Sequence, residues 1–527
     1  MKYFRSHILV ELDESSTQRG AKEVLEAIKE ELNDRNLLDE INVLQTGSLG
    51  FFNQGICLVI YPDNIVYGNM TVDMVPKLIE EHIVKGRILK NLVLDREERK
   101  DIPLEYDKRI VLSNSGIINP DKIEDYLGYG GYEAWEKVLL TMKPEDVVQT
   151  VKDSRLRGRG GAGFPAGLKW SFTAPIQSDY KCVVINADEG EPGTFKDRLI
   201  MEGDPHKLLE GTMIAAYAVA AHKAYIYIRG EYKLCIARLQ NAIDQAYDYG
   251  LLGKNIFNSG FDLDISIKIG AGAYVCGEET ALIESMEGNR GNPRSKPPYP
   301  GQRGYQSVPT VVNNVETIAN VPGIILNGAD WFWNIGTEES PGTKVFTILG
   351  DVMVPGLCEV EMGTTLRTII EKYGGGMKKS GKFKAALVGG AAGVFLAEDM
   401  LDVKMDFHNL AEYKAVLGSG AILVMDDTVN IADMLESIIR FFRHESCGKC
   451  IPCSNGNENL YESIKAIKNG RTDESELEKM ILLASTMYQT SFCALGQSLL
   501  LVVKSAIENF REDFLFYLNQ NREAVNK

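Results

Sequence analysis

Four cysteines near the C-terminal end constrain this chain more than any other feature of its sequence. Three of them are spaced two residues apart in ESCGKCIPC, and the fourth follows much later in SFCALGQS. Three closely spaced thiolates closed by a distant fourth are typical of [4Fe-4S] sites. Structural zinc also takes four cysteines, but more often from two separated pairs. The spacing therefore favours one [4Fe-4S] cluster, with the ligands Cys447, Cys450, Cys453 and Cys493.

The other five cysteines occur singly among mostly apolar or β-branched neighbours. Nine cysteines are too sparse for a disulfide scaffold in a chain of 527 residues. We expect buried, unreactive thiols at Cys57, Cys182, Cys235, Cys276 and Cys358.

Length and charge limit the class of protein. A chain of 527 residues is too long for one ordinary core, so several domains are expected. It has neither a long apolar run nor a secretory signal at its start, which predicts a cytoplasmic location. The formal net charge of -16 opposes phosphate backbones and anionic lipid. We therefore expect no nucleic acid and no direct membrane contact.

Hydrophobic periodicity sets the domain organisation, beginning with a small α/β unit over 1–95. That unit is predicted to contain a strand at 8–12, helices at 21–32 and 75–86, and a hairpin at 57–70. A charged segment at 94–109 is predicted to be a linker, because it offers little apolar surface to bury.

Three further parts follow the N-terminal unit, and the first of them includes most of the linker. Residues 96–335 alternate β-branched strands with helices and predict an α/β layer. Its strands are expected at 181–187, 223–230 and 261–271, and two of its helices at 206–221 and 233–249. Residues 336–428 carry short strands and one helix at 365–374, as in a small β-grasp unit. Residues 429–527 repeat apolar positions at helical spacing and predict a helix bundle that carries the four cysteines.

A glycine-rich segment, RLRGRGGAGFPAGLKW, lies within residues 96–335. Its glycines let backbone amides approach a phosphate, and Arg159 and Lys169 could neutralise that phosphate. Gly158, Gly160 and Gly163 match G-x-G-x-x-G, but the preceding KDSRLR looks helical, which weakens a dinucleotide-fold interpretation. A flexible loop with solvated arginines is the alternative for this segment taken alone.

Acidic and amide residues cluster at the ends of predicted strands. Asn186, Asp188, Glu189 and Glu191 lie at the end of one strand, where ligands usually bind in α/β proteins, although a divalent metal or a solvated turn would fit too. A second segment, GAGAYVCGEET, places Tyr274, Glu278 and Glu279 at a helix start, where carboxylates also offset the helix dipole. A basic loop at 290–300 and the pair Asn313 and Asn314 follow.

These segments, in this order, resemble one family closely. RGRGGAGFPAGLKW, NADEGEPGTFKDR, GAGAYVCGEETALIESMEGNRGNPRSKPPYP and ESCGKCIPC are similar to motifs of the family of FMN- and NADH-binding subunits of respiratory complex I. The same family supplies diaphorase subunits to NAD-linked formate dehydrogenases and [FeFe]-hydrogenases. The resemblance implies a multidomain α/β fold class with a thioredoxin-like N-terminal domain, a Rossmann-like FMN/NADH domain, an SLBB-type β-grasp domain and a C-terminal helix bundle with an iron–sulfur cluster.

The resemblance also implies the site residues. An FMN pocket would be formed by Gly158, Arg159, Gly160, Lys169, Asn186, Asp188, Glu189, Tyr274, Gly277, Glu278, Asn313, Asn314 and Leu495. NADH would be held by Gly161, Phe164, Phe172, Glu191, Glu279, Lys296 and Tyr299. Hydride would pass directly between NAD(H) and FMN with no catalytic acid or base from the protein, and Glu191 would lie near the nicotinamide. Glu279 near the adenosine ribose would repel a 2′-phosphate, which predicts NADH over NADPH.

The N-terminal unit resembles a thioredoxin-like [2Fe-2S] ferredoxin that has lost its cluster. Related sequences carry cysteines where this chain has Ser48 and Phe52, and near Ser15, and Cys57 alone cannot hold a cluster. We therefore expect electrons to leave through separate partners, namely a thioredoxin-like [2Fe-2S] subunit and a cluster-rich catalytic subunit of hydrogenase or formate dehydrogenase type. A subunit of a complex I-type enzyme and a non-catalytic scaffold without flavin are the alternatives.

Overall fold

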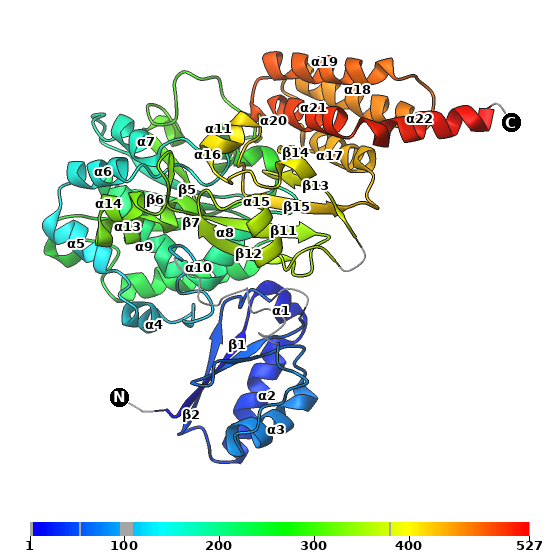
Figure 1. Cartoon of the computed structure of the whole chain (residues 1–527). Coiled ribbons are helices and arrows are strands. Elements are labelled where there is room, and N and C mark those ends of the chain that lie inside the picture. Colours follow the sequence, from blue (N-terminus) through cyan, green and yellow to red (C-terminus); the bar gives the residue numbers. More distant parts are fainter. Residues whose placement is uncertain (1–3, 52–53, 95–108, 379–380, 526–527) are drawn as a thin grey trace.

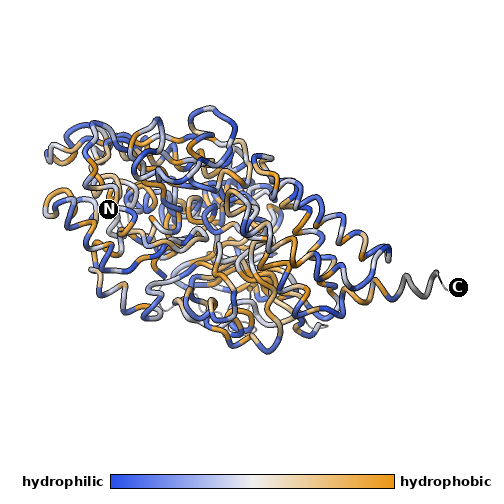
Figure 2. The backbone as a smooth tube through the Cα atoms, turned by 90° about the horizontal axis from the view of Figure 1, so that it is seen from above, coloured by the Kyte–Doolittle hydropathy of each residue, from blue (hydrophilic) through white to orange (hydrophobic). Residues whose placement is uncertain are grey.

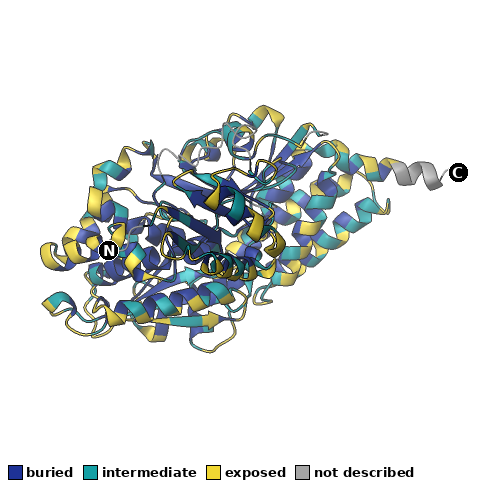
Figure 3. Ribbon diagram, turned by 90° about the horizontal axis from the view of Figure 1, so that it is seen from below, coloured by how far each residue is buried: buried dark blue, intermediate teal, exposed yellow. Residues whose placement is uncertain are grey.

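A computed structural model of the chain describes residues 4–51, 54–94, 109–378 and 381–525. Figure 1 shows a mixed α/β molecule in which an N-terminal unit lies below a central body and a group of helices extends from its far end. Apolar residues concentrate inside the central body in Figure 2, and the strands there are buried in Figure 3.

The N-terminal unit is a four-stranded sheet with the strand order β2-β1-β3-β4. Its elements are β1 (Ser6–Glu11), α1 (Glu14–Gln18), α2 (Ala21–Asp34), β2 (Ile41–Thr46), β3 (Leu58–Tyr61), β4 (Ile65–Tyr67), η1 (Val72–Met74), α3 (Val75–Leu78) and the π-helical turn η2 (Ile79–Val84). The predicted hairpin is confirmed by the antiparallel pairing of β3 with β4. Strand β2, parallel to β1, was not predicted, because its interior positions are only partly buried and its sequence INVLQT lacks a clear period.

The central body contains a parallel sheet with the order β7-β6-β5-β8. Its strands are β5 (Cys182–Ala187), β6 (Lys223–Arg229), β7 (Asp264–Gly270) and β8 (Thr310–Asn314). The three predicted strands are confirmed. Strand β8 was not predicted, because it is short and ends in two asparagines, which are uncommon in strands.

Helices cover both faces of this sheet. They are α4 (Ile123–Gly128), α5 (Glu133–Thr141), α6 (Pro144–Asp153), α7 (Ala166–Thr173), α8 (Lys196–Gly203), α9 (Pro205–Ala218), α10 (Lys233–Asp248), α11 (Glu279–Met286), α12 (Val315–Ala319), α13 (Val321–Asn327) and α14 (Ala329–Trp333), with short turns η3 (Ile256–Asn258), η4 (Tyr274–Gly277) and η5 (Tyr305–Ser307). Alternate residues of β5 enter different cores, as the two-residue period of a strand requires. Val183 and Ile185 pack with residues of α9 and α10, whereas Val184 packs in a core that includes Leu282 of α11.

A second sheet in the central body has the order β12-β11-β15-β13-β14. It comprises β11 (Thr343–Gly350), β12 (Gly356–Glu361), β13 (Phe383–Val388), β14 (Val394–Ala397) and β15 (Ala421–Asp426), with α15 (Leu366–Thr368) running into the π-helical turn η6 (Ile369–Tyr373), then η7 (Glu398–Met400) and α16 (Phe407–Glu412). A short pair, β9 (Gly336–Thr337) and β10 (Ser340–Pro341), precedes it. The strands expected from the sequence at 343–349, 356–362 and 421–427 are confirmed as β11, β12 and β15, whereas β13 and β14 were not predicted.

The C-terminal part is helical, as predicted. It consists of α17 (Ile431–Glu445), α18 (Ile451–Lys468), α19 (Ser475–Thr490), α20 (Ala494–Gln497), α21 (Leu499–Asn509) and α22 (Arg511–Val525). The most regular amphipathic face belongs to α17, which buries Leu435, Ile439 and Phe442.

Hydrogen bonds attach two segments to the central body: the N-terminal unit, and the stretch of chain that directly follows the linker. Most of the predicted linker lies outside the described residues, but the chain after it is held by Glu359, whose carboxylate accepts hydrogen bonds from the backbone N–H groups of residues 110–112 at 2.8 to 3.0 Å. In the N-terminal unit, the Leu12 carbonyl accepts a 2.8 Å bond from the Arg238 guanidinium, and Thr46 donates to the Ile118 carbonyl at 3.0 Å.

Candidate active site

The glycine-rich loop connects α6 to α7 and therefore follows a helix, as its basic leading residues indicated. The Gly158 N–H donates to the Phe164 carbonyl at 2.9 Å, which closes the loop on itself. Gly160 lies so close to Asn314 that a Cβ atom on it would stand 2.9 Å from the Asn314 Cβ. Glycine is therefore required where the loop passes the end of β8.

Arg159 is buried inside this loop, at 1% exposure. Its guanidinium donates to the carbonyls of Arg157 (2.9 Å), Pro341 (2.7 Å) and Thr343 (3.0 Å), and burial lowers its pKa to about 10. These bonds tie the loop to the start of the second sheet. The predicted contact of Arg159 with a flavin phosphate stays a prediction, and its guanidinium faces backbone carbonyls here.

Two lysines and two glutamates form a chain of ion pairs beside the loop. The Lys169 ammonium lies 3.2 Å from Glu279 and donates to the Val312 carbonyl at 3.0 Å, while Lys296 pairs with Glu278 (2.8 Å) and Glu279 (2.9 Å). Burial acts to raise the pKa of Glu279, but Lys169 and Lys296 outweigh it and hold that pKa below its usual value. Glu278 also caps α11 by accepting from the Ala281 N–H.

The end of β5 presents polar groups toward the turn η4. Asn186 donates to the Gly277 carbonyl at 2.9 Å and accepts from the Asp188 N–H at 3.0 Å. Both carboxyl oxygens of Asp188 are buried, and no described group forms a hydrogen bond with either of them. Burial raises the pKa of Asp188 to about 7. A buried carboxyl group without a hydrogen-bond partner indicates a ligand site, because a bound ligand would supply the missing hydrogen bonds.

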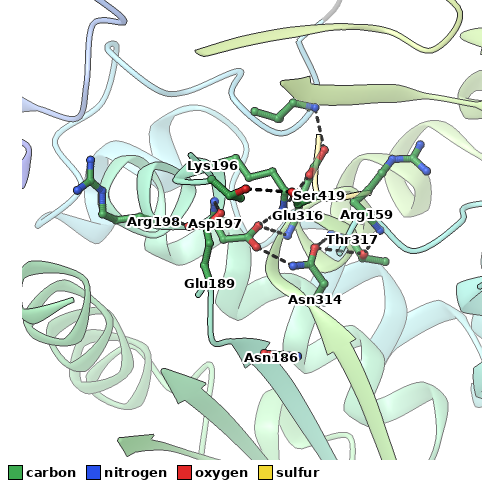
Figure 4. Close-up of polar contacts among 12 residues, drawn as sticks. Arg159, Asn186, Glu189, Lys196, Asp197, Arg198, Asn314, Glu316, Thr317 and Ser419 are labelled. Carbon is green, nitrogen blue, oxygen red and sulfur yellow. Dashed lines mark hydrogen bonds and ion pairs between the residues drawn. The ribbon is translucent and has the colours of Figure 1, made fainter. Parts of the chain in front are cut away.

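A buried network of charged residues connects Glu189 with Asn314 (Figure 4). Asp197 accepts from Asn314 at 2.7 Å and pairs with Lys196 at 2.7 Å, and its backbone N–H donates to Glu189 at 3.0 Å. Lys196 continues at 3.0 Å to Glu316. Because the charged side chains here are almost fully buried, each charge depends on its partners for compensation.

This network reaches the second sheet, since Glu316 also pairs with Lys344 of β11 at 2.6 Å. Its members Asp197, Lys196, Glu316 and Lys344 were not predicted from the sequence. A signal was present, because the lysine and aspartate directly follow the acidic turn in EPGTFKDR, but their pairing partners lie far away in the sequence.

The aromatic residues predicted to stack on NADH are exposed. Phe164 is 44% exposed, Phe172 60% and Tyr299 57%, although large apolar side chains are usually buried. Exposed aromatic rings offer stacking faces to a planar ligand. Of the other predicted residues, Asn313 accepts a 2.9 Å bond from the Trp170 indole, and Gly161 lies in open space with φ +140°.

The four predicted cluster ligands line one small pocket. Cys447, Cys450, Cys453 and Cys493 line it together with Val275, Pro293, Phe492 and Leu495. The Ser446 hydroxyl oxygen lies 3.3 Å from the Cys453 sulfur, and the Asn457 side-chain amide donates to that sulfur at 3.4 Å, contacts that suit a thiolate.

The arrangement of these thiols fits a cluster better than a single ion. Among the residues that the structure describes, no three His, Cys, Asp or Glu side chains converge closely enough to hold one metal ion. Zinc needs all four sulfurs at about 2.3 Å from one centre, whereas a cluster spreads its four ligands over separate irons. The other five cysteines are buried, as predicted, and burial raises the pKa of Cys182 to about 11 and of Cys358 to about 12.

The turn η4 lies between the end of β5 and the pocket lined by the four cysteines. Its first residue, Tyr274, donates from its backbone N–H to the Glu445 carboxylate at 2.9 Å and packs edge to face on Phe441 at 5.2 Å between ring centroids. Val275 lines the cysteine cavity, and the Gly277 carbonyl accepts from Asn186. One short turn therefore separates the end of β5 from the four cysteines.

The parallel sheet has a glycine-rich loop and a buried, unpartnered carboxyl at its strand ends, and it adjoins a pocket lined by four cysteines. This arrangement fits a redox protein with a ligand site beside an iron–sulfur cluster. Two family models match the chain: the Nuo51 FMN-binding domain at residues 151–323, and the NADH-ubiquinone oxidoreductase-F iron-sulfur binding region at residues 433–517.

Relatives extend this similarity over most of the chain. The HndC component of the NADP-reducing hydrogenase of Solidesulfovibrio fructosivorans is 48% identical over 79% of this chain and 84% of that protein. The NADH-quinone oxidoreductase F-2 subunit of Rhizobium meliloti (strain 1021) is 44% identical over 78% of this chain and 98% of that protein. A crystal structure of an NAD+-reducing [NiFe]-hydrogenase in the H2-reduced state superposes with a TM-score of 0.70 at 30% identity, covering 98% of this chain and 84% of that one.

The chain belongs to the family that comprises the F subunits of NADH-quinone oxidoreductases and the related hydrogenase subunits. It is thus an oxidoreductase of a family that acts on NADH with FMN and a [4Fe-4S] cluster, as the sequence motifs predicted. Within the described part of the chain, no helix is both long and apolar enough to cross a bilayer.

Proposed function

We propose that this chain is the diaphorase subunit of a hydrogenase or formate dehydrogenase complex, which exchanges hydride between NAD(H) and FMN and single electrons with partner iron–sulfur subunits. The observation that carries the proposal is the turn η4, because its Gly277 carbonyl is bonded to Asn186 at the end of β5 while its Val275 lines the cysteine cavity. Two redox groups bound on either side of one turn would be close enough to exchange electrons.

FMN, when bound, supplies a centre that takes two electrons as hydride and releases them singly. The chain's own residues would bind and orient it. Gly161 of the glycine-rich loop opens on free space, so a phosphate could approach the backbone amides of the loop. The Asp188 carboxyl, which has no partner in the described structure, would form hydrogen bonds with a polar edge of the flavin ring. The network around Asp197 would hold Asn314 and Glu189 in place.

NADH would bind across the exposed aromatic rings, with Phe164, Phe172 and Tyr299 as stacking faces. Lys296 and Glu279 are already paired, so the carboxylate is ionised and would accept hydrogen bonds from ribose hydroxyls. The same charge would repel a 2′-phosphate, and we therefore propose NADH as the coenzyme, although the relative from Solidesulfovibrio fructosivorans is an NADP-reducing enzyme.

A comparison of the two coenzymes tests this choice. The ratio of kcat/KM for NADH to that for NADPH should be large in the wild type and should fall in a Glu279→Gln variant. Equal turnover of both coenzymes by the wild type would refute it.

We also propose the domain identities. Residues 1–95 would form a thioredoxin-like domain without a cluster, residues 96–335 a Rossmann-like domain, residues 336–428 an SLBB-type β-grasp domain, and residues 429–527 the cluster-binding bundle. The N-terminal assignment is supported by Glu11, which accepts a 2.7 Å bond from the Ser48 hydroxyl and a 3.0 Å bond from the Leu49 N–H. A carboxyl fills the space beside Ser48, and Phe52 lies outside the described residues.

The partners would be a thioredoxin-like [2Fe-2S] subunit and a cluster-rich catalytic subunit, in the cytoplasm, where NADH is formed and consumed. A place in a complex I-type enzyme is the second candidate, and the identity to the NADH-quinone oxidoreductase protein of Rhizobium meliloti favours it. Isolation of the native complex distinguishes the two, because a hydrogenase or formate dehydrogenase subunit supports the first and quinone-reducing membrane subunits support the second.

The purified chain tests the diaphorase activity itself. It should be yellow and should reduce a viologen or ferricyanide with NADH. A colourless protein without flavin would instead support a scaffold that has lost its cofactor.

A further inference from the structure

The acidic turn after β5 packs directly against the second sheet. Thr347 of β11 donates to the Gly193 carbonyl at 2.7 Å, and the hydroxyls of Thr194 and Ser419 lie 2.9 Å apart. Thr194 is 8% exposed and Ser419 also 8%. The turn that carries Glu191 is therefore fixed to loops of a different part of the chain.

A glycine-rich loop of the second sheet holds the Glu191 side chain. This loop, GGAAG over Gly389–Gly393, joins β13 to β14. The Ala392 N–H donates to Glu191 Oε1 at 3.3 Å, and the Ser419 hydroxyl also forms a hydrogen bond with the carboxylate. The carboxylate thus receives bonds from two loops at once.

The Glu191 carboxylate occupies the space that a side chain on Gly390 would fill. A Cβ atom on Gly390 would stand 2.2 Å from Glu191 Cδ and 2.4 and 2.5 Å from its two oxygens. Such distances are too short for any contact, so a larger residue would displace the carboxylate, which is the movable end of a side chain. The absence of a side chain at Gly390 is what lets Glu191 lie against the loop.

We propose that the Gly389–Gly393 loop is a positioning element for the nicotinamide end of the coenzyme, which acts by holding the Glu191 carboxylate in one place. The inference rests on the proposed function, since it takes Glu191 as the neighbour of the nicotinamide. A carboxylate anchored by two loops offers a fixed charge and a fixed hydrogen-bond acceptor to the ring where hydride leaves. Small displacements of such a group are costly, because hydride transfer depends on orientation. The second sheet thereby contributes to the redox site through the position of Glu191.

A pair of glycine substitutions tests this role. Gly390→Ala adds the clash with Glu191, whereas Gly376→Ala adds a methyl group in open space at nearly the same backbone angle (φ +85° and +78°). Both substitutions place an alanine at a similar positive φ angle, so the difference between the two variants reports mainly the contact with Glu191. We expect Gly390→Ala to lower kcat/KM for NADH on the order of tenfold, with Gly376→Ala unchanged.

Two measurements besides turnover distinguish a positioning role of the loop from a general disturbance of the structure by the substitution. Gly390→Ala should weaken the binding of NAD+ measured by calorimetry but not that of ADP-ribose, which lacks the nicotinamide. It should also shift the flavin midpoint potential in the same direction as Glu191→Gln does. Equal loss of both ligands, or equal effects of the two glycine variants, would overturn the proposal.

A second variant serves if Gly390→Ala does not fold. Glu191→Asp keeps the charge but shortens the side chain, so that the carboxylate no longer reaches the Ala392 N–H. It should reproduce the selective loss of NAD+ binding, and wild-type behaviour of Glu191→Asp would overturn the proposal. In a Glu191→Gln background, Gly390→Ala should have no further effect if the loop acts through the carboxylate. Failure of the proposed function is distinguishable from failure of this proposal. In the first case the wild-type protein itself would lack FMN or would not be reduced by NADH, whichever variant it is compared with.

Discussion

The Glu445 carboxylate accepts a 2.9 Å hydrogen bond from the backbone N–H of Tyr274. Glu445 ends α17, two residues before the first cluster cysteine, and Tyr274 begins the turn that follows β7. The bond therefore joins the cysteine loop to the parallel sheet across a large separation in sequence, and it holds together the two halves of the redox site.

Removal of this bond should loosen the turn η4. Glu445→Ala leaves the Tyr274 N–H without an acceptor, which costs about 1–3 kcal/mol of stability. Hydrogen exchange of a peptide covering residues 271–280 should become faster. Glu445→Gln retains an acceptor oxygen and is the matched control. Identical exchange in the two variants would show that the contact does not hold the turn.

Substitution of Asp197 should weaken flavin binding without unfolding the protein. Asp197→Asn removes the charge that compensates Lys196 and weakens the bond to Asn314. We expect the FMN dissociation constant of flavin-stripped protein to rise roughly tenfold, equivalent to about 1.4 kcal/mol. Fluorescence titration measures it.

Asp513→Asn is the control for Asp197→Asn. It breaks the 2.7 Å pair with Lys384, which joins the second sheet to the helix bundle, away from the loop and strand ends. An equal rise of the FMN dissociation constant in both variants would mean that any lost ion pair weakens flavin binding, against the specific role of Asp197.

The N-terminal unit should lose stability as the pH rises. Burial, and then Asp13, raise the pKa of Glu11 from 4.5 to about 8. The folded state keeps the proton while the unfolded state releases it, so the stabilising effect is complete below pH 4.5 and is lost as the pH rises through 8. The contribution falls by up to about 1.4 kcal/mol per pH unit across that window.

Glu11→Gln should remove this part of the pH dependence, because an amide keeps the hydrogen-bonding shape without titrating. Chemical unfolding at about pH 5, 7 and 9, monitored by exchange of the N-terminal unit, compares it with the wild type. Parallel curves for the two proteins would contradict the assignment to Glu11.

Each of the four cavity cysteines should be needed for the cluster. Cys450→Ser should lower bound iron and acid-labile sulfide well below the roughly four of each that one cluster contains. Cys358→Ser, in a buried strand of the second sheet, should leave both unchanged. Metal and sulfide analysis after anaerobic reconstitution gives the answer, and full iron in the Cys450→Ser protein would contradict the ligand assignment.

Local patterns made much of this site predictable. The cysteine spacing and the glycine-rich loop are short motifs whose residues act together over a few positions, so the grouping of Cys447, Cys450 and Cys453 and the closing of the loop between Gly158 and Phe164 follow from them. Strand period located β5, β6 and β7, whereas β8 was too short and too polar for the same test.

Contacts between distant segments were not predictable. Lys344 meets Glu316 only because β11 lies beside the first sheet, and Gly390 meets Glu191 across about two hundred residues of sequence. Arg159 shows the same limit for a single side chain. Its position in the loop suggested a cation for phosphate, but sequence cannot tell whether a guanidinium faces a ligand or the three carbonyls that it contacts here.

The central claim is that NADH delivers electrons through a flavin to the cluster held by Cys447, Cys450, Cys453 and Cys493. Anaerobic titration of the purified chain with NADH, followed by visible absorption and low-temperature EPR, tests it most directly. We predict bleaching of bound FMN and the appearance of one reduced [4Fe-4S] signal per chain. Flavin that NADH does not bleach, or zinc in place of iron and sulfide, would contradict it.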